Sequence, residues 1–234
     1  GMSHKEAQVD DAASDADPGP AGRLLARLTH GRGRYSVIAG TLTIWVMDTL
    51  LSRRLESSGA VSGSTADVVR SVEQMSTVLF IATSIAIIVA ILRPYPRALL
   101  PAVAVYLSFS VIQVIANVVS MLSTAHTQAG VGLGSLWDVG AVYAMSVTVF
   151  MFVYVTLDLA TPGGAFVWPA RDGQAAPTPN LFDYLFISLN VNSTYGPTSE
   201  AVMSRVTKLV MSLQVLLAIL MLTVLISRAV AATA

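Results

Sequence analysis

Five long apolar segments constrain this chain more than any other feature of its sequence. A bilayer core about 30 Å thick is crossed by a helix of about 20 apolar residues, because each residue adds about 1.5 Å. The segments that fit this template are 35–51, 76–92, 98–122, 139–160 and 206–230. The sequence therefore predicts an all-α polytopic membrane protein with about five transmembrane helices, surrounded by a lipid bilayer.

Composition agrees with this prediction and excludes several classes of function. Hydrophobic residues make up 54% of the chain and charged residues 12%, whereas soluble domains have about 25% charged residues. The net charge is zero, so no nucleic-acid partner is expected. The chain has no cysteine, its three histidines are scattered, and it carries no catalytic or cofactor fingerprint. We therefore expect neither an enzyme nor a bound metal or cofactor.

The chain divides into three predicted parts. Residues 1–33 read as a disordered cytoplasmic tail, because the opening is rich in Gly, Pro, Ala, Ser and Asp. Residues 34–160 form a four-helix transmembrane region. Residues 161–234 contain a loop, a short pore-like helix and the final transmembrane helix. Four basic residues precede the first span and favour a cytoplasmic N-terminus: Arg23, Arg27, Arg32 and Arg34.

The connector between the fourth and fifth spans is the least ordinary part of the sequence. Its first half, 161–179, is rich in Pro and Gly and contains Trp168, an amphipathic residue expected at the membrane interface. In the second half, Asn180 precedes an apolar run and Asp183 follows three positions later, as at the start of a capped helix. A helix over 181–190 is predicted, about 15 Å long.

A helix of this length leaves two arrangements open. It spans only half of a bilayer, and it can lie at membrane depth only where protein or a water-filled cavity surrounds its ends. Alternatively, it lies flat on the membrane surface as an amphipathic helix. In that case four side chains on one face are buried in lipid: Phe182, Leu185, Phe186 and Leu189.

The order of a short aromatic helix, Thr194-Tyr195-Gly196, a polar loop and a final apolar span resembles the pore loop and inner helix of the potassium-channel superfamily. The resemblance covers residues 180–230. It implies that backbone carbonyls replace the hydration shell of a monovalent cation, in a pore built from several copies, expected to be a homotetramer. The ion-pathway residues that it implies are Asn190, Asn192, Ser193, Thr194, Tyr195 and Gly196.

The loop departs from the family pattern Thr-Val-Gly-Tyr-Gly-Asp at two informative positions. Thr194 stands in place of the first filter glycine and Pro197 in place of the acid. The filter needs left-handed backbone at its glycines, which is costly for other residues, so potassium-type selectivity is not expected. The whole chain also resembles a group of uncharacterised bacterial integral membrane proteins with a channel-like segment before the last span, which implies the bacterial plasma (inner) membrane. The residues that carry this second resemblance are Asp183, Tyr184, Leu185, Ser188, Asn190, Pro197 and Thr198.

The orientation of the connector stays open on the sequence alone. A cytoplasmic N-terminus followed by five spans places residues 161–202 inside, and the basic residues favour this arrangement. A potassium-channel pore loop instead faces outside. If segment 35–51, which contains Asp48, did not cross the membrane, the channel-like orientation would be restored.

Polar residues within the spans give the remaining candidates. Gln113 and Asn117 lie four residues apart on one helix face, and Gln214 lies in the last span. Buried amides usually join helices by hydrogen bonds of about 0.6–2 kcal/mol each, and the alternative is that they line a polar path. Asp48 and Asp158 are candidates for a proton relay or cation site. Both lie near span ends, so anchoring at the interface is the expected role.

Two functions follow from these observations. The first is a channel-like protein that conducts cations through an oligomeric pore lined by residues 190–197. The second is a non-conducting membrane scaffold or partner-binding subunit that retains a channel-like fold.

Overall fold

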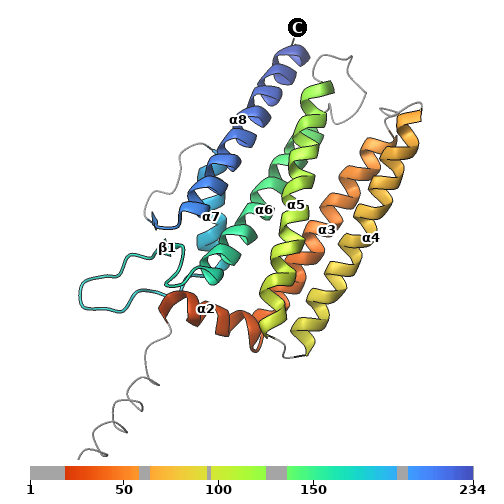
Figure 1. Ribbon diagram of the computed structural model, residues 1–234. Coiled ribbons are helices and arrows are strands. Elements are labelled where there is room, and N and C mark those ends of the chain that lie inside the picture. The colour runs from red at the N-terminus through yellow and green to blue at the C-terminus, as the bar shows by residue number, and fades with distance from the viewer. Residues whose placement is uncertain (1–18, 58–63, 94–95, 125–135, 194–199, 234) are drawn as a thin grey trace, which may run out of the picture.

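Long helices account for most of the chain in the computed structural model, which describes residues 19–57, 64–93, 96–124, 136–193 and 200–233. The helices pack side by side as an elongated bundle (Figure 1), so the all-α polytopic fold is confirmed. In chain order they are α2 (Gly19–Thr29), α3 (Gly33–Ser57), α4 (Ser64–Leu92), α5 (Pro96–Thr124), α6 (Leu136–Ala160), α7 (Leu181–Asn192) and α8 (Arg205–Thr233).

Four of these helices are long and apolar enough to cross a membrane. The candidate spans in the described part of the chain are Gly33–Arg54, Ala98–Ser123, Leu136–Ala160 and Arg205–Ala231. In α4 only Thr77–Val89 is strongly apolar, because the first part of this helix carries polar and charged residues. It is nevertheless one continuous helix that packs along α5, as expected for an antiparallel hairpin.

Helix α6 forms the centre of the bundle. It contacts α2, α3, α5, α7 and α8, and half of the residues in its apolar window are buried, against a third or less in the other candidate spans. Two short strands, β1 (Phe166–Val167) and β2 (Ala201–Val202), pair antiparallel beside its carboxyl end. Any side chain that points from α6 toward α7 or α8 therefore lies inside the protein.

Helix α2 corrects the prediction that residues 1–33 form a disordered tail. Residues 19–29 are helical and lie across the end of the bundle (Figure 1). Leu24 and Leu28 are one turn apart and both are buried against the bundle, while Arg23 donates to the carbonyl of Ala176 (2.6 Å) and to Thr178 Oγ1 (3.0 Å). Composition alone missed this helix because its apolar stripe is short. Residues 1–18 lie outside the described residues.

Helix α3 bears on the two orientations left open by the sequence. It continues through Asp48 without interruption for 25 residues, and its apolar part is long enough to cross a membrane. The alternative in which 35–51 does not cross is therefore not supported. The start of α3 and the connector 161–180 lie at the same end of the bundle, next to α2 (Figure 1).

The basic residues are concentrated at the α2 end of the bundle. Those at or near the α2 end are Arg23, Arg27, Arg32, Arg34, Arg93, Arg97, Arg171, Arg205 and Lys208, and those nearer the opposite end are Arg53, Arg54, Arg70 and Arg228. Since short cytoplasmic segments carry the excess of Lys and Arg, we infer that the α2 end faces the cytoplasm.

This orientation can be tested with single cysteines, because the chain has none of its own. Asp172→Cys lies at the exposed connector and Trp137→Cys lies at the exposed start of α6, at the other end of the bundle. In spheroplasts of a bacterial expression host, we expect a membrane-impermeant thiol reagent to label Trp137→Cys directly and Asp172→Cys only after the membrane is opened. The reverse pattern would contradict the inferred orientation.

Candidate functional site

Helix α7 begins as its local sequence predicts. Asn180 Oδ1 accepts hydrogen bonds from the backbone N–H groups of Phe182 (2.8 Å) and Asp183 (3.2 Å), and Asp183 Oδ2 accepts one from the N–H of Asn180 (2.7 Å). This reciprocal capping box satisfies N–H groups that the first turn of a helix leaves unpaired. The predicted helix is confirmed, with 12 residues and a length of about 18 Å.

The depth of α7 in the bundle is set by its contacts with α6. Near the start of α7, Tyr184 donates to Asp158, close to the carboxyl end of α6. At its end, Asn192 accepts from Ser146 (3.3 Å), which lies near the middle of Leu136–Ala160. The helix therefore runs antiparallel to α6 from the α2 end of the bundle and stops halfway along it, as a half-membrane helix.

The alternative of a helix lying flat on the membrane surface is therefore wrong, although the predicted lipid-facing side is largely correct. Phe182, Phe186 and Leu189 are exposed on the outer face of α7, and Leu185 is half-buried. The opposite face carries three polar side chains beside Ile187 and Val191 and is covered by α6 and α8, so protein surrounds the part of α7 that could not face lipid.

Polar side chains from three helices meet on this covered face. Tyr184, Ser188 and Asn192 recur every four residues on α7, a spacing that places them on one side of the helix. The group, called here the buried polar cluster, has no exposed surface and consists of Ser146, Tyr154 and Asp158 of α6, Tyr184, Ser188 and Asn192 of α7, and Gln214 of α8.

Asp158 binds both the connector and α7. Its Oδ1 accepts the backbone N–H groups of Ala165 (2.7 Å) and Phe166 (3.1 Å), and its Oδ2 accepts the indole N–H of Trp168 (3.2 Å) and the hydroxyl of Tyr184. Four donors match the four acceptor positions of an ionised carboxylate. Anchoring of Asp158 in interfacial water is thus wrong, because the chain folds back over this carboxylate and excludes water from it.

Tyr184 is the donor that joins α7 to this carboxylate. Tyr184 is wholly buried, and its hydroxyl donates its hydrogen to Asp158 Oδ2. A carboxylate has no hydrogen to donate, so the direction of this bond is fixed.

Two glycines allow the connector to wrap around Asp158. Gly163 and Gly164 have φ angles of +77° and +88°, in the region that favours glycine. A Cβ atom added to Gly164 would lie 3.0 Å from Asp158 Oδ1, which is closer than most Cβ contacts. Glycine at this position therefore lets the backbone approach the carboxylate without crowding it.

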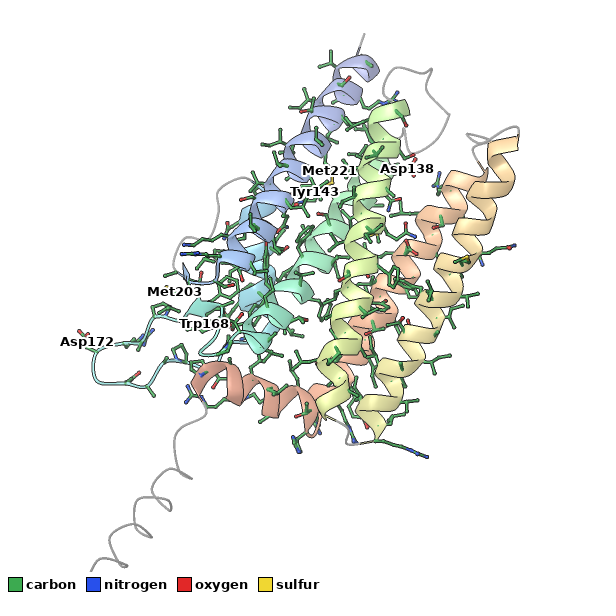
Figure 2. All side chains as sticks on the ribbon, viewed as in Figure 1. Asp138, Tyr143, Trp168, Asp172, Met203 and Met221 are labelled. Carbon is green, nitrogen blue, oxygen red and sulfur yellow. The ribbon has the colours of Figure 1, made fainter. Side chains whose placement is uncertain are left out.

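Trp168 lies inside the protein, and its expected place at the membrane interface stays a prediction. Only 7% of its surface is exposed, and its ring packs against that of Tyr184, with ring centres 5.2 Å apart. Figure 2 shows Trp168 against the bundle, whereas Asp172 lies at the outer tip of the connector. The connector is a loop, as predicted, but its first part is docked on α6.

Gln214 joins the three helices at the other end of the buried polar cluster. Its Nε2 group lies within hydrogen-bond distance of the carbonyl of Ser188 (3.1 Å), Ser188 Oγ (3.0 Å) and Asn192 Oδ1 (3.3 Å). Its Oε1 accepts the hydroxyl of Tyr154. The expectation that buried amides hold helices together is confirmed for Gln214.

The other predicted intramembrane polar residues lie outside this cluster. Asn117 is buried and its Nδ2 lies 3.7 Å from Met145 Sδ, a weak hydrogen bond between α5 and α6. Gln113 is half-buried one turn away on α5. Asp48 is half-buried on α3, which packs on α2, α4 and α6.

Three of the six predicted ion-pathway residues are described by the structure. Asn192 is wholly buried inside the chain, so its side chain supports the structure from within and does not line a surface. Ser193 ends α7, with its N–H donating to the carbonyl of Leu189 (2.8 Å). Asn190 is half-buried. The predictions for 194–196 lie outside the described residues.

Several residues of the buried polar cluster were not predicted from the sequence as site residues. Tyr154, Tyr184 and Ser188 were not singled out as site residues, although the four-residue recurrence on α7 and the matching spacing of Ser146, Tyr154 and Asp158 on α6 are visible in the sequence. That pattern could have indicated two polar faces. It could not have shown that they face each other.

Comparisons of the chain with models of protein families, with curated proteins and with solved structures found no match.

Replacing Asp158 should lower the stability of the whole protein and loosen the connector around it. Asp158→Asn replaces one acceptor oxygen by an NH2 group that faces N–H or O–H donors, and leaving buried donors unpaired costs about 1–3 kcal/mol each. We expect a clearly lower unfolding midpoint in detergent and faster amide hydrogen exchange over 161–168. Asp172→Asn, in the exposed part of the same connector, is the control and should change neither. Unchanged exchange in Asp158→Asn would contradict the role of the carboxylate.

The contact between Gln214 and Tyr154 predicts a measurable coupling. In a double-mutant cycle of Gln214→Ala and Tyr154→Phe, we expect a coupling of about 0.6–2 kcal/mol in the free energy of unfolding. The control cycle pairs Gln214→Ala with Thr148→Ala, because Thr148 bonds only to the carbonyl of Ala144 in its own helix. The control should be additive, and additivity of both cycles would contradict the contact.

Proposed function

We propose that the protein is a channel-like integral membrane protein in which several copies surround a pore for monovalent cations. The observation that carries the proposal is α7, a half-membrane helix packed on α6 and α8 whose carboxyl end lies level with the middle of α6. The carboxyl end of a helix carries unpaired carbonyls and the negative end of its dipole. This end can stabilise a cation inside the membrane.

The order of α6, α7 and α8 supports the proposal, because it matches an outer helix, a pore helix and an inner helix. In this interpretation residues 194–197 form the constriction that follows the pore helix. Asn192 acts as a positioning residue, because its buried side chain contacts Gln214 and Ser146. It holds the end of α7 in place and does not contact the ion.

Buried polar atoms without a partner also support a hydrated site. Asn190 Nδ2, Asn192 Nδ2 and Thr207 Oγ1 are buried and have no hydrogen-bond partner in the described structure. Such atoms usually bind ordered water. Two of the three lie in the last turn of α7, next to the proposed constriction.

The concentration of basic residues at the α2 end gives the proposed pore an orientation. We infer that α7 enters the membrane from the cytoplasmic side of a bacterial plasma membrane, opposite to a potassium-channel pore loop. With Thr194 in place of a filter glycine, the proposed pore discriminates among monovalent cations differently from a potassium-type filter.

A second candidate function is a non-conducting scaffold or partner-binding subunit. It is favoured by the hydrogen bonds of Asn192 and Gln214, which connect three helices of one chain, and by the apolar outer face of α7. In that case the buried polar cluster stabilises the fold and nothing passes along α7.

Flux measurements on the reconstituted protein separate the two functions. In liposomes with a cation gradient, we expect potassium or sodium flux above that of empty liposomes. Tyr195→Ala/Gly196→Ala should lower it at least about tenfold, because the change removes the constriction, and Asn192→Leu should lower it by disturbing its support. Asp172→Asn, in the exposed connector, is the matched control and should conduct like the unchanged protein.

Two results would overturn the channel proposal. One is flux equal to that of empty liposomes for the unchanged protein and for the Tyr195/Gly196 variant alike. The other is a strictly monomeric protein both in mild detergent and in nanodiscs, since the proposed pore requires several copies.

A further inference from the structure

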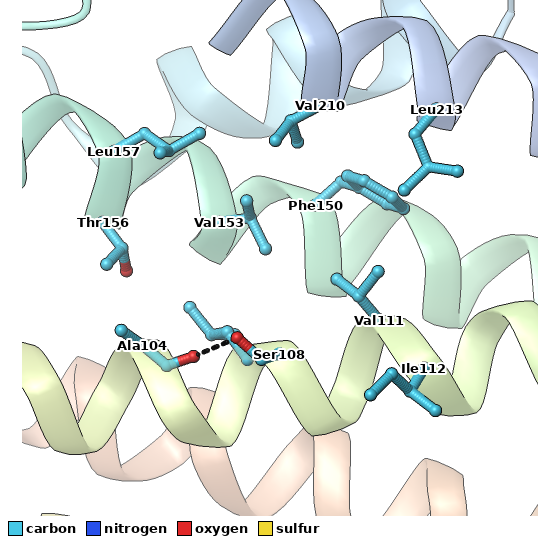
Figure 3. Close-up of a pocket in the computed structure, with 11 residues that line it drawn as sticks. Ala104, Ser108, Val111, Ile112, Phe150, Val153, Thr156, Leu157, Val210 and Leu213 are labelled. Atoms are coloured by element: carbon cyan, nitrogen blue, oxygen red, sulfur yellow. Dashed lines mark hydrogen bonds between the residues drawn. The ribbon is translucent and has the colours of Figure 1, made fainter. Parts of the chain in front are cut away.

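An apolar cavity lies between α5, α6 and α8 and shares no lining residue with the buried polar cluster. Its volume is about 370 Å³, within the range of roughly 300–1,000 Å³ found for small-molecule sites. Figure 3 shows side chains from all three helices around it, including Ala104 and Ser108 of α5, Phe150 and Val153 of α6, and Val210 and Leu213 of α8. All three helices are candidate membrane spans, so the cavity is next to bilayer lipid.

The lining of this cavity leaves no side-chain hydroxyl free to bind a polar ligand. Ser108 Oγ donates to the carbonyl of Ala104 (2.8 Å), and Thr156 Oγ1 donates to the carbonyl of Phe152 (2.9 Å). Both hydroxyls are thus satisfied within their own helices. The remaining lining is aliphatic or aromatic, so an occupant must be hydrocarbon at this point.

The shape of the cavity suits a chain of hydrocarbon. From Ala104 to Ile112 the lining extends over about 12 Å along α5, so an acyl chain can lie along the helices and contact all three of them.

A second apolar cavity lies next to this one, toward α2. A smaller cavity of about 50 Å³ shares Thr156 with the larger one and is also lined by Leu25, Leu28 and Thr29 of α2. Apolar surface thus continues from the middle of the bundle to the helix that lies across its end (Figure 1). Lipid head groups are expected at the ends of membrane-spanning helices.

The charge at this end is suited to an anionic head group. Residues 19–47 contain four arginines and no acidic residue. Arg27, next to Leu28, and Arg32 are exposed, whereas Arg23 binds the connector. Basic residues near a membrane surface attract anionic lipids, by about fivefold in affinity per residue.

From these observations we propose that the cavity between α5, α6 and α8 is a binding site for an anionic phospholipid of the leaflet at the α2 end. One acyl chain fills the cavity along α6, and the phosphate lies near Arg27 and Arg32. None of the residues that line this cavity belongs to the proposed constriction, 194–197, or to the buried polar cluster that supports it.

The test is a lipid titration of the full-length protein in mild detergent, followed by native mass spectrometry. We expect phosphatidylglycerol to bind at least about fivefold more tightly than phosphatidylcholine. Ser108→Trp fills the cavity and should remove one bound lipid of either kind. The double variant Arg27→Gln/Arg32→Gln should remove the preference for phosphatidylglycerol. The acyl chain should still bind in the cavity.

Matched controls lie elsewhere on the same surface. Ile85→Trp adds the same side chain on the exposed face of α4, and Arg53→Gln removes an exposed charge at the opposite end. Neither should change lipid binding. Ala104→Phe fills the same cavity one turn away and replaces Ser108→Trp if that variant does not fold.

Three outcomes would overturn the proposal. The first is that the protein binds the two lipids with equal affinity. The second is that the folded cavity-filling variant binds as much lipid as the unchanged protein. The third is that this variant no longer forms oligomers in the mass spectrum but keeps its bound lipid. The last outcome would assign the cavity to a second copy of the chain. Lipid binding is measured without flux, so either proposal can fail alone.

Discussion

The hydrogen bonds of the Asp158 carboxylate are the interaction on which the rest of this structure depends. A carboxylate buried near the end of a membrane helix is stable only if its acceptor positions are filled. Here the backbone of Ala165 and Phe166, the indole of Trp168 and the hydroxyl of Tyr184 fill them. One side chain of α6 therefore fixes both the start of the connector and the position of α7.

The position of α7 in turn brings the other polar residues together. With Tyr184 held at the carboxyl end of α6, the antiparallel helix places Ser188 and Asn192 one and two turns deeper, where Gln214 of α8 reaches both. Helix α7 can lie at this depth because its polar face meets protein and its apolar face is left for lipid. The same constraint explains why α6 is the most buried span: it provides the polar partners on one side and apolar packing on the other.

The two proposed sites use different but neighbouring residues of this central helix. Asp158, Tyr154 and Ser146 face α7 and form the support of the proposed constriction, whereas Phe150 and Val153 line the apolar cavity next to α5 and α8. Segment 194–199 is flanked by residues held at different depths. Ser193 is bonded within α7 near the middle of the bundle, and Ala201 pairs with Val167 in the short sheet beside the carboxyl end of α6.

The sequence by itself determined the features that depend on residues close together in the chain. The apolar segments predicted the long helices, although within the described residues only four helices meet the length and hydropathy of a full span, and Asn180 with Asp183 predicted the start of α7. The tertiary structure decided the features that depend on distant residues. Tyr184 is 26 residues from Asp158, and Gln214 is 60 residues from Tyr154, so no local pattern could show that Asp158 and Asn192 are buried or that Trp168 turns inward. The helix at 19–29 and the uninterrupted α3 likewise depend on packing against the bundle. Periodicity and capping act within one or two turns, whereas burial is decided by whichever part of the chain folds against a residue.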